Sequence, residues 1–143
     1  MADRVEDGEA GFLGEGKRFF LHYDFPGYAT NEPGGGGRPG RREIGHGRLA
    51  EKAVEAVQPE NWPYAVRITC EVTSSNGSSS MASVVAACLA CQDAGVPISA
   101  QVAGVSVGVV ERAGEYKLLT DITGTEDHYG GMDFKVRRKR REA

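Results

Sequence analysis

The fold is decided by residues 64–97, which read YAVRITCEVTSSNGSSSMASVVAACLACQDAGVP. Apolar and polar side chains alternate from Tyr64 to Val72, which predicts a strand with one buried face. Apolar residues then follow helical spacing from Ser79 to Ala94, and Gly95 and Pro97 end the helix. A serine-rich loop joins the two elements. The apolar residues that we expect on the buried side of the helix are Met81, Val84, Val85, Cys88 and Leu89.

Further elements are predicted on both sides of this stretch. Upstream, Phe19 to Tyr23 is a short apolar strand, and His46 to Val57 has the spacing of a helix. Downstream, Ile98 to Val110 is an almost continuous apolar run, which favours a strand buried on both faces. Partner strands are predicted at Tyr116 to Ile122 and Met132 to Val136. This order indicates a mixed α+β fold.

The length of the chain leaves room for about one domain. It has 143 residues with 17 basic and 20 acidic side chains. Because six of the basic residues lie between Lys135 and Arg141, the rest of the chain is acidic. An acidic body disfavours broad electrostatic capture of nucleic acid, so a polyanion needs a local site. Three cysteines are too few for a disulfide framework, and no apolar run reaches the ~20 residues of a bilayer span. We therefore expect an intracellular protein with no membrane contact.

The domain boundaries follow from the same patterns. Residues 1–17 are acidic and glycine-rich, and we expect a disordered lead-in there. Residues 18–136 form the predicted core, interrupted at 31–40 by a flexible loop with four consecutive glycines. Residues 137–143 are a basic tail, for which a solvated end is as good an interpretation as RNA contact.

Three consecutive serines, Ser78 to Ser80, lie where the loop enters the helix. The first N–H groups of a helix are unpaired and the helix dipole is positive there, so this position suits a small anion such as phosphate. Gly77 would let the backbone come close to that ligand. The alternative is an ordinary serine N-cap, for which one serine is enough.

Two carboxylates and a lysine follow near the end of the chain. Asp133 and Lys135 are two apart on a predicted strand and so share a face. Asp127 precedes them in a polar loop, Thr123 to Gly131, and can fold back toward Asp133. The group suits Mg²⁺, which prefers carboxylate, water and phosphate oxygens. The alternative is a solvated hairpin edge with a salt bridge.

Arg41 and Arg42, with His46 and Arg48, suit contact with RNA phosphates. The alternative is a solvated helix start. Cys88 and Cys91 have the spacing of a metal or redox pair, but they lie on the apolar side of a helix with no second pair of ligands. We interpret them as buried small residues.

Together these strings resemble the second catalytic core of the polynucleotide phosphorylases, a branch of the RNase PH family. The likeness runs in unbroken order over about residues 18 to 136. The matching segments are RFFLHY at 18–23, FP at 25–26, RREIGHGRLA at 41–50, EVTSSNGSSSMAS at 71–83, DAGVP at 93–97, EDH at 126–128 and MDFKV at 132–136.

The resemblance implies a role for each candidate residue. The residues that it assigns to phosphate binding are Ser78, Ser79, Ser80 and His46. Those that it assigns to the RNA 3′ end are Arg41 and Arg42. Those that it assigns to catalysis are Asp127, Asp133 and Lys135, with Mg²⁺ held by the two aspartates.

The resemblance also implies a fold and an activity. The fold is a β-α-β sandwich of the ribosomal protein S5 domain 2 type, incomplete here at its C-terminal end. Full-length members of the family assemble into a homotrimeric ring. The activity is 3′-to-5′ phosphorolysis of RNA in RNA degradation, which releases nucleoside diphosphates. Two alternatives stay open: a non-catalytic subunit of an exosome-type ring, and a relative that acts on tRNA ends. The compartment would be the cytoplasm in a bacterium, or a mitochondrion or plastid in a eukaryote.

The chain departs from the family pattern at two places. Gly131 stands where the family usually has an aspartate, and the basic run from Arg137 to Arg141 stands where a small Ala-Gly segment usually follows. A first RNase PH-like half and the KH and OB-type domains are not in this sequence. We therefore expect a fragment of the family's enzyme.

We predict that the 143-residue chain, purified alone, does not degrade RNA at a useful rate. Strands need neighbours to stay ordered, and a site displaced by ~1 Å can lose about 100-fold in rate. The measurement is nucleoside diphosphate release from labelled poly(A) with Mg²⁺ and phosphate. Turnover near that of a full-length relative would contradict the prediction.

Overall fold

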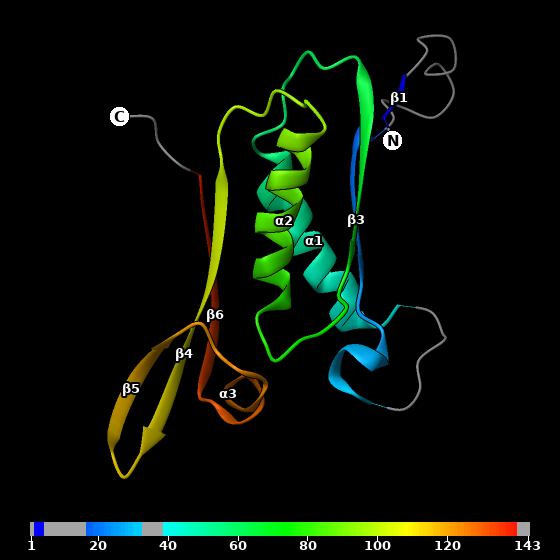
Figure 1. Cartoon of the computed structure of the whole chain (residues 1–143). Coiled ribbons are helices and arrows are strands. Elements are labelled where there is room, and N and C mark those ends of the chain that lie inside the picture. Colours follow the sequence, from blue (N-terminus) through cyan, green and yellow to red (C-terminus); the bar gives the residue numbers. More distant parts are fainter. Residues whose placement is uncertain (1, 5–16, 33–38, 140–143) are drawn as a thin grey trace.

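The computed structural model describes residues 2–4, 17–32 and 39–139. Within these ranges it contains two three-stranded sheets and three α-helices, drawn in Figure 1. In chain order the elements are β1 (Ala2–Arg4), β2 (Phe19–Asp24), the 3-10 helix η1 (Gly27–Thr30), α1 (Arg41–Glu55), β3 (Tyr64–Glu71), α2 (Ser79–Asp93), β4 (Val102–Arg112), β5 (Glu115–Thr120), α3 (Gly124–Tyr129) and β6 (Met132–Lys139).

The helices α1 and α2 lie between the two sheets (Figure 1). In the first sheet, the order is β1-β3-β2, with β2 parallel and β1 antiparallel to β3. Helix α1 makes the crossover that the parallel pair β2 and β3 requires. In the second sheet, β4 lies between β5 and β6 and is antiparallel to both. The structure is the β-α-β sandwich expected from the sequence. None of the helices in the described ranges has the length and apolar character that a bilayer span requires.

The core lies between the helices and the first sheet. Val54, Val57 and Val84 are fully buried there, and burying a side chain of this size contributes about 1.5–3 kcal/mol. Helix α1 approaches β2 closely at Gly47, where an added Cβ would lie 3.2 Å from the Cβ of Tyr23. Cys88 and Cys91 are buried and free, in agreement with their interpretation as small core residues.

One charged side chain belongs to this core. Glu51 of α1 is only 4% exposed and accepts the backbone N–H of Leu21 in β2 at 3.0 Å. It also pairs with Lys17 and Arg48, each at 2.5 Å. Burial alone would raise the pKa of the Glu51 carboxyl, but these donors lower it below its usual value. The buried charge is therefore compensated, and it ties β2 to α1.

Helix α1 begins at Arg41, five residues before the predicted start at His46. Its first turn is stabilised by Glu43, whose carboxylate accepts the N–H of Gly40 at 2.5 Å and that of Phe25 at 3.2 Å. Apolar spacing could not reveal these first residues, because four of them are charged or glycine and the fifth, Ile44, is 58% exposed. Arg41 and Arg42 thus belong to a helix and not to the loop before it.

The buried side of α2 differs from the predicted one. Met81, Val84 and Cys88 are buried as expected, but Val85 is 37% and Leu89 57% exposed. The helix instead turns small residues toward α1 and the second sheet, which lets these layers pack closely. The full set of buried α2 residues is Ser80, Met81, Ser83, Val84, Ala87, Cys88 and Cys91.

Strand β4 begins at Val102, and the prediction that both its faces are buried was wrong. Its buried residues alternate with more exposed ones, because α2 and the segment at Ile122 cover one face of this sheet. The sequence of β4 is almost continuously apolar because its outer face carries valines in addition to the buried inner face. Strand β6 continues through Lys139, three residues beyond the predicted end at Val136. Arg137 in this extension donates to the carbonyl of Leu49 in α1 at 3.3 Å.

The polar segment 123–131 is not a plain loop, because it contains helix α3. Glu126 accepts the backbone N–H of Thr123 at 2.8 Å and also bonds the Thr123 hydroxyl. This reciprocal cap lets a six-residue helix form without an apolar stripe. The Thr-x-x-Glu spacing was a signal in the sequence that apolar periodicity does not detect.

The loop before α2 packs against the residues that lead into α3. Gly77 has a φ of +99°, and an added Cβ would lie 2.4 Å from the Ile122 carbonyl oxygen. The carbonyl of Asn76 accepts the N–H of Gly124 at 3.1 Å. The close approach seen at Gly77 is therefore to the chain itself, and the approach of a ligand to this glycine stays a prediction.

We predict that Gly77→Ala destabilises the chain much more than Gly95→Ala. Gly95 has a φ of +75° with nothing within 4 Å of an added Cβ, so alanine there meets only backbone strain of about 1–2 kcal/mol. Alanine at Gly77 adds a backbone clash to the same strain. Urea unfolding of the two variants measures the difference, and equal losses of unfolding free energy would contradict the packing described.

Candidate functional site

A cavity of about 780 Å³ lies where the N-terminus of α2, the start of α1 and α3 meet. Phe25, Asn31 and Asn76 contribute further walls. Of the candidate residues named from the sequence, those that line it are Arg42, His46, Ser78, Ser79, Ser80, Asp127 and Lys135. The fold thus gathers most of these residues from segments far apart in the sequence.

The three serines, here called the serine turn, form the entry into α2. Ser78 is the N-cap residue, in the left-handed conformation with φ 56°, and its side chain makes no capping bond. The alternative of an ordinary serine cap is therefore wrong. Its carbonyl accepts the N–H groups of Met81 and Ala82, both at 3.1 Å. The N–H groups of Ser79 and Ser80 precede these and have no acceptor within the helix.

The three hydroxyls of the serine turn differ in their partners. Ser78 Oγ bonds Ser106 Oγ and donates to the carbonyl of Ile122 at 3.2 Å, so it holds the turn to the second sheet. Ser79 Oγ lies 2.8 Å from the hydroxyl of Tyr23. Ser80 Oγ is buried and has no hydrogen-bond partner among the described residues. A buried hydroxyl without a partner is costly, so this one favours a ligand or water beside it.

Asp127 and Asp133 lie close together on α3 and β6. Arg42 donates to Asp127, and Lys135 pairs with Asp133. Burial acts to raise the pKa of Asp127, but hydrogen bonds from Arg42 and Asp133 and the charges of Arg42 and Lys135 lower it. The two carboxyl groups are therefore direct neighbours, each paired with a cation.

Strand register places Asp133 and Lys135 on the inner face of the second sheet. Asp133 lies opposite Gly108 and Lys135 opposite Ser106 in β4, and Ser106 is fully buried. The ion pair between them is the one that the alternative of a hairpin edge foresaw, and β6 is an edge strand of its sheet. Lys135 also lines the cavity, whereas Asp133 does not.

His46 stands on α1 at the back of the cavity. Its ring meets the ring of Tyr23 edge to face, with centroids 5.7 Å apart. Burial lowers the pKa of His46, and the positive charges of Lys135 and Arg42 lower it further. A neutral imidazole at neutral pH can serve as either a hydrogen-bond donor or an acceptor.

The arginines expected to act together are separated. Arg42 reaches the cavity, whereas Arg41 is exposed and does not line it. Arg48 pairs with Glu51, on the side of α1 that meets β2. Helical spacing explains this, because Arg42 points about 100° away from Arg41, whereas Arg41 and Arg48 lie about two turns apart on nearly the same side of α1.

Sequence reasoning missed three residues that hold the site together. Tyr23 bonds Ser79, Ser106 bonds Ser78, and Asn76 Oδ1 accepts the N–H of Gly124 at 3.3 Å. Tyr23 and Ser106 lie in strands, where an apolar pattern gives no sign of their contacts. Asn76 stood beside the serines and was the one that loop chemistry could have indicated.

Asp127 and Asp133 supply some of the oxygen ligands that a divalent cation such as Mg²⁺ needs. Within the described ranges, no three His, Cys, Asp or Glu side chains gather into a metal-binding group. Two neighbouring carboxylates are nevertheless what Mg²⁺ commonly takes from a protein, since water and phosphate oxygens complete its shell. Asp127 and Asp133 meet that requirement.

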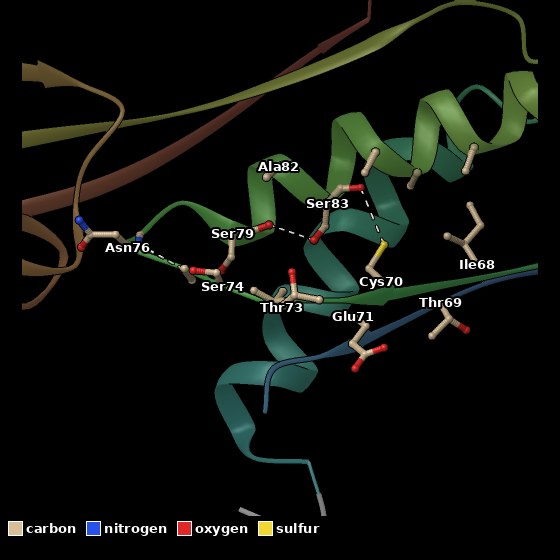
Figure 2. Close-up of a pocket in the computed structure, with 16 residues that line it drawn as sticks. Ile68, Thr69, Cys70, Glu71, Thr73, Ser74, Asn76, Ser79, Ala82 and Ser83 are labelled. Carbon is tan, nitrogen blue, oxygen red and sulfur yellow. Dashed lines mark hydrogen bonds between the residues drawn. The ribbon is translucent and has the colours of Figure 1, made fainter. Parts of the chain in front are cut away.

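A second groove, of about 460 Å³, runs between β3 and α2 (Figure 2). Figure 2 shows Asn76, Ser74 and Ser79 at one end of this groove and Ile68 at the other. Ser83 donates to the carbonyl of Ser79 at 2.9 Å along its wall. The segment from Ser74 to Gly77 lines both the groove and the cavity, so it separates the two.

Comparisons with known proteins agree with this architecture. Residues 2–97 match the model of the 3′ exoribonuclease family, domain 1. The chain is 59% identical over 121 residues to the polyribonucleotide nucleotidyltransferase of Magnetococcus marinus, covering 83% of this chain and 17% of that protein. The enzymes of the same name from Koribacter versatilis and Legionella pneumophila are 54% and 56% identical over 129 residues, which are 88% of this chain. The chain thus spans about a sixth of the length of these relatives.

A solved structure shows the same fold. Rice Rrp46 superposes with a TM-score of 0.70 over 99% of this chain and 67% of that chain, at 14% sequence identity. At that identity the likeness concerns the fold alone. The family match and the fold lead to the same result: the chain belongs to the 3′ exoribonuclease family and has its RNase PH-like fold.

Proposed function

We propose that this chain is the phosphorolytic core of a 3′-to-5′ exoribonuclease, a polyribonucleotide nucleotidyltransferase. One observation carries the proposal: a single cavity brings the serine turn to Asp127, Lys135 and Arg42. The similar bacterial proteins are named polyribonucleotide nucleotidyltransferase, which supports the proposal. The reaction transfers the 3′-terminal nucleotide of RNA to inorganic phosphate and releases a nucleoside diphosphate.

The serine turn is the proposed phosphate site. Its free N–H groups and the positive end of α2 favour an anion, and the hydroxyl of Ser80 lacks any other partner among the described residues. Ser78 contributes through its backbone, because its hydroxyl is already bonded to Ser106 and Ile122. His46, which lines the same cavity, provides a further neutral contact.

The chemistry follows from this placement. An oxygen of the bound phosphate forms a bond to the phosphorus of the last phosphodiester, and the bond from that phosphorus to the 3′ oxygen of the preceding nucleotide breaks. Asp133 manages the proton that passes to the leaving oxygen, and Lys135 stabilises the negative charge that develops. Asp127 and Asp133 would hold Mg²⁺, which screens charge on the phosphate oxygens when it is bound.

The RNA 3′ end is the proposed partner of the cavity mouth. The Arg42 side chain is 71% exposed while it pairs with Asp127, so it can reach a phosphate beside that pair. Arg41 would contact RNA farther out. We further propose assembly into a homotrimer, as the resemblance implies, and a bacterial cytoplasmic setting, because the relatives named above are bacterial proteins.

Inorganic phosphate is expected to bind the 143-residue chain at the serine turn. Ser79→Ala should weaken binding about tenfold, the effect of about one hydrogen bond to a charged group. Titration followed by NMR, with shifts mapped to residues 76–80, is the measurement. Ser99→Ala is the matched control, since Ser99 is exposed and bonds the carbonyl of Val57 outside the cavity. Unchanged affinity in Ser79→Ala would remove the serine turn from the site.

In a complete enzyme that carries this core, Asp133→Asn should abolish phosphorolysis and leave RNA binding nearly intact. The amide keeps the shape of the side chain but can neither manage the proton nor supply a charged ligand. Nucleoside diphosphate release and RNA filter binding measure the two properties. Asp93→Asn is the control, because Asp93 is exposed at the end of α2 opposite to the serine turn. Retained turnover in Asp133→Asn would exclude Asp133 from the chemistry.

A further inference from the structure

Tyr23 lies behind the wall of the cavity and reaches the serine turn from another layer of the fold. It stands near the end of β2, is 4% exposed, and does not itself line the cavity. Its hydroxyl lies 2.8 Å from Ser79 Oγ. This contact joins the first sheet to the N-terminus of α2.

The ring of Tyr23 is held firmly. It stacks on Phe25 with centroids 6.2 Å apart, and His46 meets it edge to face. Helix α1 also packs closely against Tyr23 at Gly47, where an added Cβ would lie 3.2 Å from the Tyr23 Cβ. Because these contacts fix the Tyr23 side chain, its hydroxyl keeps a constant position beside the Ser79 hydroxyl and so orients it.

Hydrogen-bond capacity decides which partner donates when an anion is present. Each hydroxyl has one proton and can also accept. Burial raises the pKa of Tyr23, so its hydroxyl keeps its proton at neutral pH. An unprotonated phosphate oxygen can only accept, so a Ser79 hydroxyl that binds one gives its own proton to the anion and accepts from Tyr23.

The other two serines do not depend on such a partner. Ser78 is fixed by Ser106 and Ile122, and Ser80 has no partner among the described residues. Ser79 is therefore the member of the serine turn whose proton is directed by a side chain of the first sheet.

We propose that Tyr23 is a positioning residue for phosphate: its O–H donates to Ser79 Oγ and so directs the Ser79 proton into the cavity. The inference rests on the proposed phosphate site and adds to it a residue that never touches the substrate. It also makes anion binding depend on the packing of β2 against α2.

The test is phosphate binding to the 143-residue chain with Tyr23→Phe, which keeps the ring and removes the hydroxyl. We expect affinity for inorganic phosphate to fall about fivefold, since the Ser79 hydroxyl loses its fixed direction. Tyr28→Phe is the matched control, because it removes a hydroxyl bonded to Glu71 at 2.6 Å outside the cavity. It should leave the affinity unchanged.

A double-mutant cycle separates positioning from general stability. In the Ser79→Ala background, Tyr23→Phe should have no further effect on phosphate affinity. A loss that persists there, or a fall in affinity that only follows a lower unfolding midpoint, overturns the proposal. If the parent chain binds phosphate and Tyr23→Phe binds equally well, the proposal fails and the phosphate site stands. If the parent chain binds no phosphate, the site itself fails and the proposal with it.

Discussion

The site depends on the contact between the backbone at Gly77 and the backbone of residues 122–124. No side chain fits between them, since an added Cβ at Gly77 would lie 2.4 Å from the Ile122 carbonyl oxygen. Asn76 bonds Gly124 through both its carbonyl and its side chain, and Ser78 bonds Ile122 just beyond. The serine turn and α3 are thereby fixed to each other, although the first begins a helix that lies between the sheets and the second connects two strands of the second sheet.

Charged side chains of both signs surround the cavity. Asp127 pairs with Arg42, and Asp133 with Lys135. Glu32 and Glu43 also line the cavity. The serine turn adds a positive potential without any charged side chain. In the proposed function, phosphate binds at these neutral groups, and the ion pairs are available to exchange partners with RNA phosphates or a cation. On that proposal, an acidic chain holds a polyanion at a local site and needs no broad basic surface.

Much of the fold and part of the candidate site could be predicted from the sequence, because strong local patterns indicate them. The alternation before Val72 and the helical spacing after Ser79 indicated the right elements, and the two carboxylates around residue 130 are neighbours as expected. The errors have physical causes. Exposure of Leu89 could not be foreseen, because apolar spacing does not tell which side of a helix its neighbours cover. Helix α3 was missed because a reciprocal cap, and not apolar periodicity, stabilises it. The pairing of Tyr23 with Ser79 joins residues 56 apart, and no local pattern encodes such a contact.

The two glycines after α3 show how packing and chemistry can be told apart. An added Cβ at Gly130 would lie 2.4 Å from the Glu126 carbonyl oxygen, so glycine is required there by space. At Gly131 it would meet only the Val109 carbonyl oxygen, at 3.7 Å, which is an ordinary contact. A larger residue such as the aspartate usual in the family would therefore fit at 131 without disturbing the backbone. Because space does not require glycine at this position, its effect is on the charge beside Asp133, where the chain presents two carboxylates and no third.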